Sequence, residues 1–273
     1  MSHHPPFKQV EAARPDFEEE PFAYTKTPAP EWVPGQGSNQ LPWPVDAPFK
    51  HIDPAHEQPG LVYKLIIGGI DEHGKQNLAP FSYFAPCGHN PPMVVFSCSS
   101  PGPDKQKDTC NNVKTTKEFV VNIISEAFIE AANYTSIDAP ADLSEWDLAG
   151  LTREPSQVVK PPRVKESAFS MECVLEHYYD MKDDEGRVTG TSLFGRVKLF
   201  HVREDVLQPN YVIDQAKLQS MSRLGGISYG RTTKGLELAR PVWSPVESQR
   251  KEVEQALLPV NNPGSTKADA PPS

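Results

Sequence analysis

The chain has 273 residues and a formal net charge of −9. This acidic balance argues against a nucleic-acid-binding protein, whose phosphate contacts need clustered Lys and Arg, and against binding to an anionic membrane surface. No stretch approaches the roughly 20 apolar residues of a membrane-spanning helix.

The cysteines and the first residues bear on the compartment. The four Cys residues form no CxxC pair and no zinc-type spacing, so we expect ordinary reduced thiols. The first residues lack the charged and then apolar layout of a secretory signal peptide. We therefore expect a cytoplasmic protein.

Proline divides the chain into three parts. Of the 29 Pro residues, residues 1–60 hold 12, residues 241–273 hold 6 and the middle holds 11. Because Pro removes a backbone donor and favours extended geometry, we predict an N-terminal arm over 1–50, a folded domain over 51–240 and a disordered tail over 241–273. The arm carries Phe17, Phe22, Tyr24, Trp32 and Trp43. These aromatics favour an arm that docks on the folded body or a partner subunit over a disordered segment with incidental aromatics.

The middle of the chain reads as short strands separated by turns. Strands are predicted over 61–70, 78–84, 92–97, 118–124, 168–179 and 189–202. Helices are predicted over 108–116, 125–134 and 214–221, with Ser125 as an N-cap. Asp183–Gly186 is predicted to be a hairpin turn. About six closely spaced strands and few helices favour a mainly β barrel over a doubly wound sheet, in which strands and helices alternate.

The first candidate ligand segment is a strand that contains a proline. It reads Asn77-Leu78-Ala79-Pro80-Phe81-Ser82-Tyr83-Phe84. Pro80 should bend this strand away from its sheet and expose backbone donors and acceptors, which the polar edge of a flat heterocycle needs. The alternative is an ordinary edge strand with a bulge.

The second candidate segment, residues 97–109, joins a buried strand to a helix start. Its hydroxyls, its lysines and the free N–H groups of the helix N-terminus together suit a phosphate. Lys107 would supply charge, and Thr109 and the Ser hydroxyls would supply hydrogen bonds. The GxxxxGK[ST] loop is absent. The alternative is a polar loop with Asp108 as the N-cap.

The third candidate segment is Arg223-Leu224-Gly225-Gly226-Ile227-Ser228-Tyr229. Paired glycines allow close backbone approach, and Arg and Tyr suit a charged or aromatic ligand. The alternative is a surface loop with an Arg–carboxylate pair. No GxSxG or HExxH motif occurs. We assign no catalytic acid or base and no metal ligand, and expect His201 and Glu172 to be an ordinary strand histidine and a surface or capping carboxylate.

These segments, in this order, resemble the flavin reductase-like family of FMN-binding split barrels. The resemblance spans about residues 61–229, and its motifs are shared in order and spacing. The matching segments are residues 77–84, 90–97, 107–112, 116–122 and 161–164, Ser167, Glu172-Cys173 and residues 223–226. The extended loop at 101–104 and the arm depart from the family pattern, which leaves the phosphate ligands open.

The resemblance implies a six-stranded Greek-key split β-barrel with a few flanking helices, a homodimer, and one FMN per subunit near the dimer interface. It assigns Asn77, Leu78, Ala79, Pro80 and Ser82 to the isoalloxazine ring. It assigns Ser97, Ser99, Lys107 and Thr109 to the phosphate and ribityl chain. It places Arg223, Gly226 and Tyr229 at the open face, where nicotinamide or another substrate would stack.

The activity implied is that of an NAD(P)H:flavin reductase, in which NADH or NADPH transfers a hydride to flavin N5. The cofactor supplies that chemistry, so the missing acid–base residues do not argue against an enzyme. Two alternatives stay open. One is a specialised FMN enzyme that acts on a small organic substrate, and the other is a non-catalytic flavin-binding protein.

Overall fold

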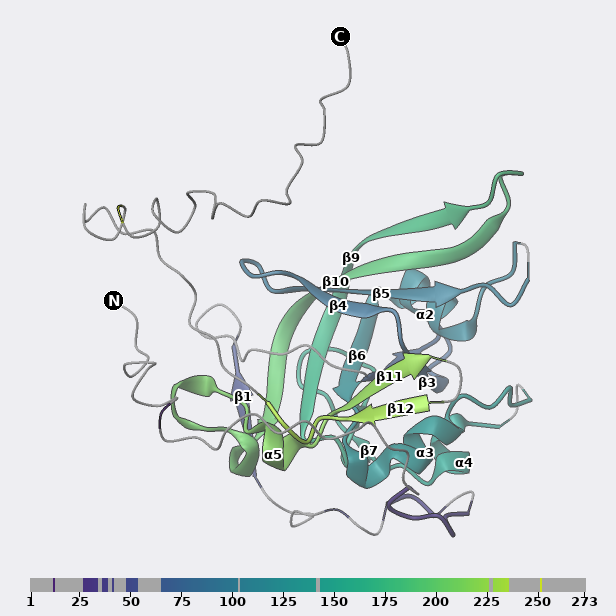
Figure 1. The fold of residues 1–273 in the computed structure, drawn as a ribbon. Helices are drawn as coiled ribbons and strands as arrows, with labels where there is room; N and C mark the ends of the chain where they lie inside the picture. Colours follow the sequence, from purple (N-terminus) through teal and green to yellow (C-terminus); the bar gives the residue numbers. More distant parts are fainter. Residues whose placement is uncertain are drawn as a thin grey trace, which may run out of the picture. The chain divides into compact units, whose positions relative to one another are not determined.

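A computed structural model describes residues 12, 27–33, 36–38, 41, 48–53, 65–102, 104–140, 143–225, 228–235 and 251 (Figure 1). The compact unit spans Phe22–Lys234, and the described residues 12, 235 and 251 lie outside its bounds. The expected tail and most of the expected arm therefore lie outside the described residues, and the three-part division of the chain stays a prediction.

One antiparallel sheet organises the protein. The described strands are β1 Phe49–Ile52, β2 Leu65–Ile70, β3 Gln76–Phe81, β4 Phe84–Gly88, β5 Met93–Ser99, β6 Glu118–Ile123, β7 Arg153–Glu154, β8 Arg163–Val164, β9 Phe169–Lys182, β10 Val188–Arg203, β11 Met221–Gly225 and β12 Ser228–Arg231. The helices are α2 Asp108–Thr116, α3 Ile129–Tyr134, α4 Glu145–Ala149 and α5 Gln215–Leu218, with 3₁₀ turns η1 Glu126–Phe128, η2 Glu204–Val206 and η3 Pro209–Tyr211. Eight strands form the main sheet, seven of them in the order β3-β2-β6-β9-β10-β5-β4, and β1 also pairs with β10.

The two longest strands, β9 and β10, run through the middle of the sheet (Figure 1). Their pairing shifts register at three places, between Val188 and Gly190, between Phe194 and Gly195, and between Val197 and Leu199. Such bulges bend a strand and increase its twist, which lets the sheet curl. β5 pairs with the first half of β10 and β1 with its last four residues, so the two strands share one edge of β10.

Two apolar cores lie on opposite faces of the β2–β3 hairpin. Ile67 and Phe81 point into the barrel core with Phe96 and Phe119. Neighbouring residues of the same strands, such as Leu78, point into a second core that α3 and α4 cover. This alternation is the period of two that a strand imposes. The hairpin is therefore held from both faces.

Several sequence predictions are confirmed. The fold is mainly β, α2 spans Asp108–Thr116 as predicted, and Asp183–Gly186 is the turn between β9 and β10. The main sheet has eight strands where about six were expected. The additional strands are β1, which lies in a Pro-rich segment, and β4, which contains Pro86 and follows β3 after only two residues.

Other predictions need correction. The helix expected over 125–134 begins as the 3₁₀ turn η1 and continues as α3, and Ser125 makes no side-chain cap bond. The backbone N–H of Glu126 instead bonds to the carbonyl of Gln219. The alternative of a surface loop at 223–229 does not hold for the described residues of this segment, because 223–225 lie on β11 and 228–229 lie on β12. Among the described helices, none is long and apolar enough to cross a membrane.

Candidate functional site

A buried amide joins β3 to α2. Asn77 Nδ2 donates to Thr109 Oγ1 at 2.6 Å, and Asn112 Nδ2 donates to Asn77 Oδ1 at 2.9 Å. Asn77 and Thr109 are both buried. A Cβ at Gly69 would lie 2.6 Å from Asn77 Oδ1, so glycine makes room for this amide. The structure therefore brings together the start of the 77–84 segment and the end of the 97–109 segment, as the sequence predicted.

No side chain caps the N-terminus of α2. Its N-cap residue, Lys107, makes no side-chain cap bond, and its side chain is exposed. The first-turn N–H groups carry a partial positive charge, and Lys107 adds a full charge beside them. Asp108, which the sequence offered as a cap, is exposed in the first turn and adds a negative charge there. Uncapped N–H groups beside an ammonium group form a donor set that fits a phosphate.

The hydroxyls of β5 face away from the barrel core. Ser97 Oγ lies 2.8 Å from Ser192 Oγ on β10, whereas its neighbours Phe96 and Cys98 point into the core. Ser97 N donates to the carbonyl of Tyr83, so the two candidate segments also meet along β5. Ser99 is exposed at the end of the strand. The candidate hydroxyls thus follow one face of β5 toward the 97–109 loop.

The remaining residues of the 77–84 segment differ in exposure. The Leu78 side chain is fully buried in the second core, and its N–H donates to Glu145 Oε2 at 3.3 Å. The whole residue is 0% exposed, so its backbone carbonyl does not reach the surface in this structure either. Ala79 and Pro80 are half-buried, and Ser82 is exposed. The segment can offer a ligand backbone groups and small side chains.

Arg223 and Tyr229 lie together on the β11–β12 hairpin. The Arg223 guanidinium lies 4.7 Å from the centre of the Tyr229 ring, and Tyr229 Oη donates to Asn133 Oδ1 of α3 at 2.6 Å. Burial raises the pKa of Tyr229, although Arg223 opposes the shift. The bond to Asn133 connects the β11–β12 hairpin to α3. The 97–109 segment is instead connected to β3 through Thr109 and to β10 through Ser97. Gly226 lies outside the described residues.

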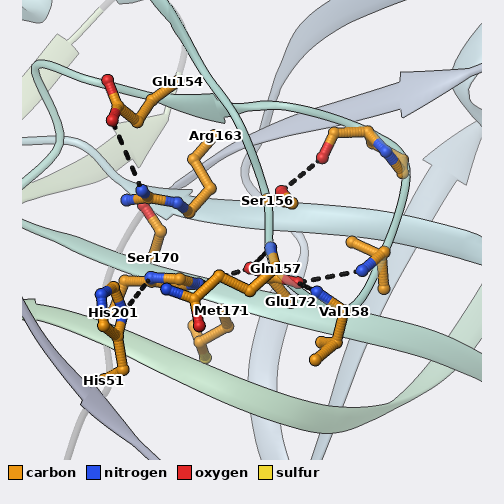
Figure 2. Close-up of polar contacts among 12 residues, drawn as sticks. His51, Glu154, Ser156, Gln157, Val158, Arg163, Ser170, Met171, Glu172 and His201 are labelled. Carbon is orange, nitrogen blue, oxygen red and sulfur yellow. Dashed lines mark hydrogen bonds and ion pairs between the residues drawn. The ribbon is translucent and has the colours of Figure 1, made fainter.

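A second polar cluster, which sequence reasoning missed, lies between β1, β9 and β10 (Figure 2). His201 Nε2 lies 2.5 Å from Glu172 Oε1, and both side chains are fully buried. His51 Nδ1 lies 2.8 Å from His201 Nδ1. Because an ionised carboxylate only accepts, His201 donates from Nε2, and its Nδ1 then accepts from His51. This chain of bonds connects three strands.

Glu172 also holds a loop. Its carboxylate accepts hydrogen bonds from the backbone N–H groups of Gln157, Val158 and Val159 at 2.6–3.0 Å. Burial opposes the charged form, but His201 and these N–H groups outweigh burial and lower the pKa of Glu172. Glu172 is therefore an ionised anchor inside the fold. The expectation of a surface or capping carboxylate is wrong about its position.

Arg163 completes this cluster. Its guanidinium lies 5.2 Å from the Phe49 ring of β1 and 4.0 Å from Glu154. Its Nε and Nη1 have no hydrogen-bond partner among the described residues. Burial is the largest cause that lowers the pKa values of His51 and His201, and the positive charge of Arg163 lowers them further. Both imidazoles are thus kept neutral, which the hydrogen-bond chain requires.

One sequence signal could have revealed this cluster. Glu172 is a lone carboxylate in the strand segment Ser170-Met171-Glu172-Cys173-Val174. A charged residue inside a buried strand needs a partner. Its partner His201 lies 29 residues further along the chain, on the other strand of the β9–β10 hairpin. The third member, His51, was not legible, because it is 150 residues from His201 and reaches it only through β1–β10 pairing.

A surface depression of about 490 Å³ lies between the β2–β3 turn and α4, and none of its lining residues belongs to either cluster. Two cations line it, Lys75 and Arg153. Arg153 already donates to Asp147, Ser144 and Gln76, so its charge is engaged within the protein. Within the described residues, no group of three or more His, Cys, Asp or Glu could hold a metal ion.

Known proteins share this architecture. Residues 64–222 match the model of the flavin reductase like domain. An uncharacterized protein from Aquifex aeolicus is 36% identical over 179 residues, which cover 62% of this chain and 88% of that protein. The structure of nitrilotriacetate monooxygenase component B from Bacillus cereus is 34% identical, with a TM-score of 0.61, and the match covers 66% of this chain and 89% of that one.

A further solved structure is more distant. The 2-nitrobenzoate 2-nitroreductase NbaA from Pseudomonas fluorescens is 26% identical, with a TM-score of 0.57, and the match covers 69% of this chain and 90% of that one. The domain match takes in the 77–84 segment, the 97–109 loop and the β9–β10 hairpin, and the matched structures share the split-barrel fold. The chain therefore belongs to the flavin reductase-like family of FMN-binding split barrels.

Proposed function

We propose that the protein is an NAD(P)H:flavin reductase that uses FMN. The observation that carries the proposal is the uncapped N-terminus of α2 with exposed Lys107 beside it, tied to β3 through Asn77 and Thr109. Bound FMN supplies the capacity to accept a hydride at N5. The chain supplies the position of the cofactor and the charges around it.

Each candidate residue has a role in this proposal. Lys107 and the first-turn N–H groups of α2 hold the phosphate, and the hydroxyls of Ser97 and Ser99 follow the ribityl chain. Thr109 already accepts from Asn77, so it contributes through its remaining hydroxyl hydrogen. The isoalloxazine ring lies against the small side chains of Ala79, Pro80 and Ser82, and Leu78 packs into the second core and helps to hold this strand in place.

The reductant binds on the other side of the ring. Arg223, Gly226 and Tyr229 are the proposed contacts for NADH or NADPH. Arg223 stacks on Tyr229, which offers a flat aromatic surface beside a positive charge. Stacked rings at contact distance are the main requirement of hydride transfer, so no acid–base residue is needed.

A homodimer in the cytoplasm is part of the proposal. Tyr83 is 69% exposed and Tyr179 is 62% exposed. In the sheet, Ser192 lies between its cross-strand partners Tyr179 and Ser97. The N–H of Ser97 in turn donates to the carbonyl of Tyr83. The two tyrosines therefore flank the Ser97–Ser192 contact. Exposed aromatics on one sheet face support an interface with a second copy next to the proposed FMN site.

A second candidate function is reduction of a small organic substrate, such as a nitroaromatic compound. The 26% identity with the nitroreductase from Pseudomonas fluorescens supports it. In that case the Arg223–Tyr229 pair would contact the substrate as well as the nucleotide.

The visible absorbance of the purified protein tests the proposal. NADPH and then NADH are added without oxygen. Bleaching of a bound-flavin spectrum supports the reductase and identifies the nucleotide used. A spectrum that stays oxidised with both nucleotides excludes the reductase and leaves a flavin carrier or another flavoenzyme. No flavin at purification and no binding of added FMN would overturn the flavin function altogether.

A further inference from the structure

The β11–β12 hairpin stands apart from the main sheet. Among the described strands, β11 and β12 pair only with each other, and a lone two-stranded hairpin is at best marginally stable in water. One backbone bond, from Met221 N to the carbonyl of Ile124, attaches the start of the hairpin. The hairpin therefore depends on side-chain contacts to hold the Arg223–Tyr229 pair in one position.

Those contacts come from the segment 124–134, which ends in α3. Arg231 Nε donates to Glu126 Oε2 at 2.8 Å, and Tyr229 Oη donates to Asn133 Oδ1 at 2.6 Å. The first bond reaches η1 and the second reaches the last turn of α3. The position of the hairpin is thus set by the position of this helical segment.

The N-terminal arm contacts the same helix. Ala29 N donates to Glu130 Oε1 at 2.9 Å, and the Trp32 ring lies 5.4 Å from the Tyr134 ring. Tyr134 directly follows Asn133, so the arm contacts the residue next to the one that holds the hairpin. α3 has only six residues, and so short a helix depends on the contacts around it.

A glycine fixes the arm beside the helical layer. Trp32 Nε1 donates to the carbonyl of Gly37 at 2.7 Å, and Gly37 N donates to the carbonyl of Ala149, the last residue of α4, at 3.1 Å. Gly37 has a φ of 66°, and a Cβ at this position would lie 2.4 Å from the carbonyl oxygen of Gly150. Only glycine fits this close approach. The arm is therefore seated by a specific backbone contact as well as by its tryptophan.

We propose that residues 27–38 of the arm form a strap that fixes α3 and, through α3, holds the β11–β12 hairpin. Trp32 and Asn133 are then positioning residues for the Arg223–Tyr229 pair. The strap stands on the contacts described above. Only its consequence for the reducing nucleotide rests on the proposed function.

The coupling has a simple physical route. The last turn of a helix frays readily, and Tyr134 lies in the last turn of α3. Without Trp32 against it, this turn opens more often, and Tyr229 loses its acceptor on Asn133. Trp32 and Tyr229 also pack against the same second core. A surface that is formed for a smaller fraction of the time binds its ligand more weakly by that fraction.

Hydrogen exchange of the full-length protein, followed by mass spectrometry, tests the strap. In Trp32→Ala we expect the β11–β12 amides to exchange about 5- to 150-fold faster, the usual range of coupling between two sites. Gly37→Ala should do the same, because it unseats the arm without touching the tryptophan. Val33→Ala is the matched control, since Val33 is adjacent in the arm and 58% exposed, and should change nothing.

Two results would overturn the strap. One is an unchanged rate for the β11–β12 amides in both Trp32→Ala and Gly37→Ala. The other is an equal acceleration in the centre of β10, because the effect would then be a general loss of stability. Combining Trp32→Ala with Asn133→Ala should give no faster exchange than Asn133→Ala alone, since both act through one bond, and an additive effect would remove α3 as the route.

Steady-state kinetics tests the consequence for the nucleotide. In Trp32→Ala we expect KM for the reducing nucleotide to rise about 5- to 150-fold, with a smaller change in kcat and in Val33→Ala no change. FMN affinity should stay at the wild-type value, because the proposed phosphate contacts lie on α2 and β5. Faster hairpin exchange with an unchanged KM would support the strap and remove the hairpin as the nucleotide contact.

Discussion

The two polar clusters of this barrel differ in how completely their groups are paired. Around Glu172, the carboxylate accepts three backbone N–H groups and one imidazole, all inside the fold, and among the described residues only Nε and Nη1 of the neighbouring Arg163 lack a hydrogen-bond partner in this cluster. At the start of α2, the helix N-terminus is uncapped and Lys107 is exposed. Satisfied buried polar groups stabilise a fold, whereas open donors beside a positive charge are available to a ligand. Whether a polar group is buried and paired, rather than whether it is a His or a Glu, therefore decides whether it stabilises the fold or is available to bind a ligand.

The largest expected effect tests the structural role of Glu172. Glu172→Ala leaves three backbone N–H groups and His201 without their acceptor, so we expect the free energy of unfolding to fall by about 3–5 kcal/mol. Denaturation in urea measures it. Glu176→Ala on the same strand is the matched control, because Glu176 pairs with Arg196 at the surface, and should cost about 0–1 kcal/mol. Equal losses would contradict the distinction.

The next effect tests the ligand role of α2. Lys107→Ala removes the charge beside the helix N-terminus, so we expect FMN to bind about 10- to 150-fold more weakly, which corresponds to the loss of a charged hydrogen bond of about 1.5–3 kcal/mol. Fluorescence titration with FMN measures it. Stability should not change, since the side chain is exposed. Lys182→Ala, at the far end of β9, is the control, and unchanged affinity in Lys107→Ala would remove the phosphate assignment.

Acid should act on the buried cluster. The pKa of His201 is lowered from 6.5 in the folded protein, so the unfolded chain binds a proton first, and stability is lost as pH falls below about 6.5. The pKa of Glu172 is lowered from 4.5, so its stabilisation is lost at still lower pH, through its folded pKa. The slope from one group is at most about 1.4 kcal/mol per pH unit.

Urea denaturation at successive pH values measures this dependence. His201→Gln should flatten the curve just below pH 6.5, because the group that gains the proton on unfolding is gone. His73→Gln is the control, since His73 lies at the surface with an 81% exposed side chain. Identical slopes in His201→Gln and the wild type would show that His201 is not kept neutral.

The smallest effect concerns the proposed open face. Tyr229→Phe removes the hydrogen bond to Asn133, so we expect a loss of about 0.5–1.5 kcal/mol in the free energy of unfolding. Tyr179→Phe removes an exposed hydroxyl and should leave the stability of the subunit unchanged. If both variants behave alike, the β11–β12 hairpin is not held by this contact.

Local chemistry made some elements predictable. The turn at Asp183–Gly186 needed only its own residues, because Asp183 accepts from the backbone of Glu185 and Arg187 and Gly186 has a φ of 82°. The α2 helix likewise begins where the Pro-rich loop ends and stops at Lys117, which has a φ of 63°. Such features depend on short segments, which a sequence displays directly.

Long-range contacts limited the rest. Ser125 looked like a cap, but the backbone of Gln219 satisfies the first helical N–H, and nothing near residue 125 announces that partner. The same holds for Asn77, whose role as a buried link to Thr109 depends on how α2 packs against β3. The sequence identified the segments of the candidate site, whereas tertiary packing decided which of their side chains remain open to a ligand.

In the loop 157–159, whose N–H groups donate to Glu172, one residue is exposed to solvent and yet bonded to a buried group. Val158 is 52% exposed, yet its N–H bonds to the carboxylate of Glu172, which is fully buried. Amide hydrogens exchange with solvent only when their bonds open. Opening this loop breaks the pairing of a buried charge, so the amides of residues 157–159 should exchange as slowly as those of the central strands. A segment without regular secondary structure would then share the kinetic protection of the barrel core.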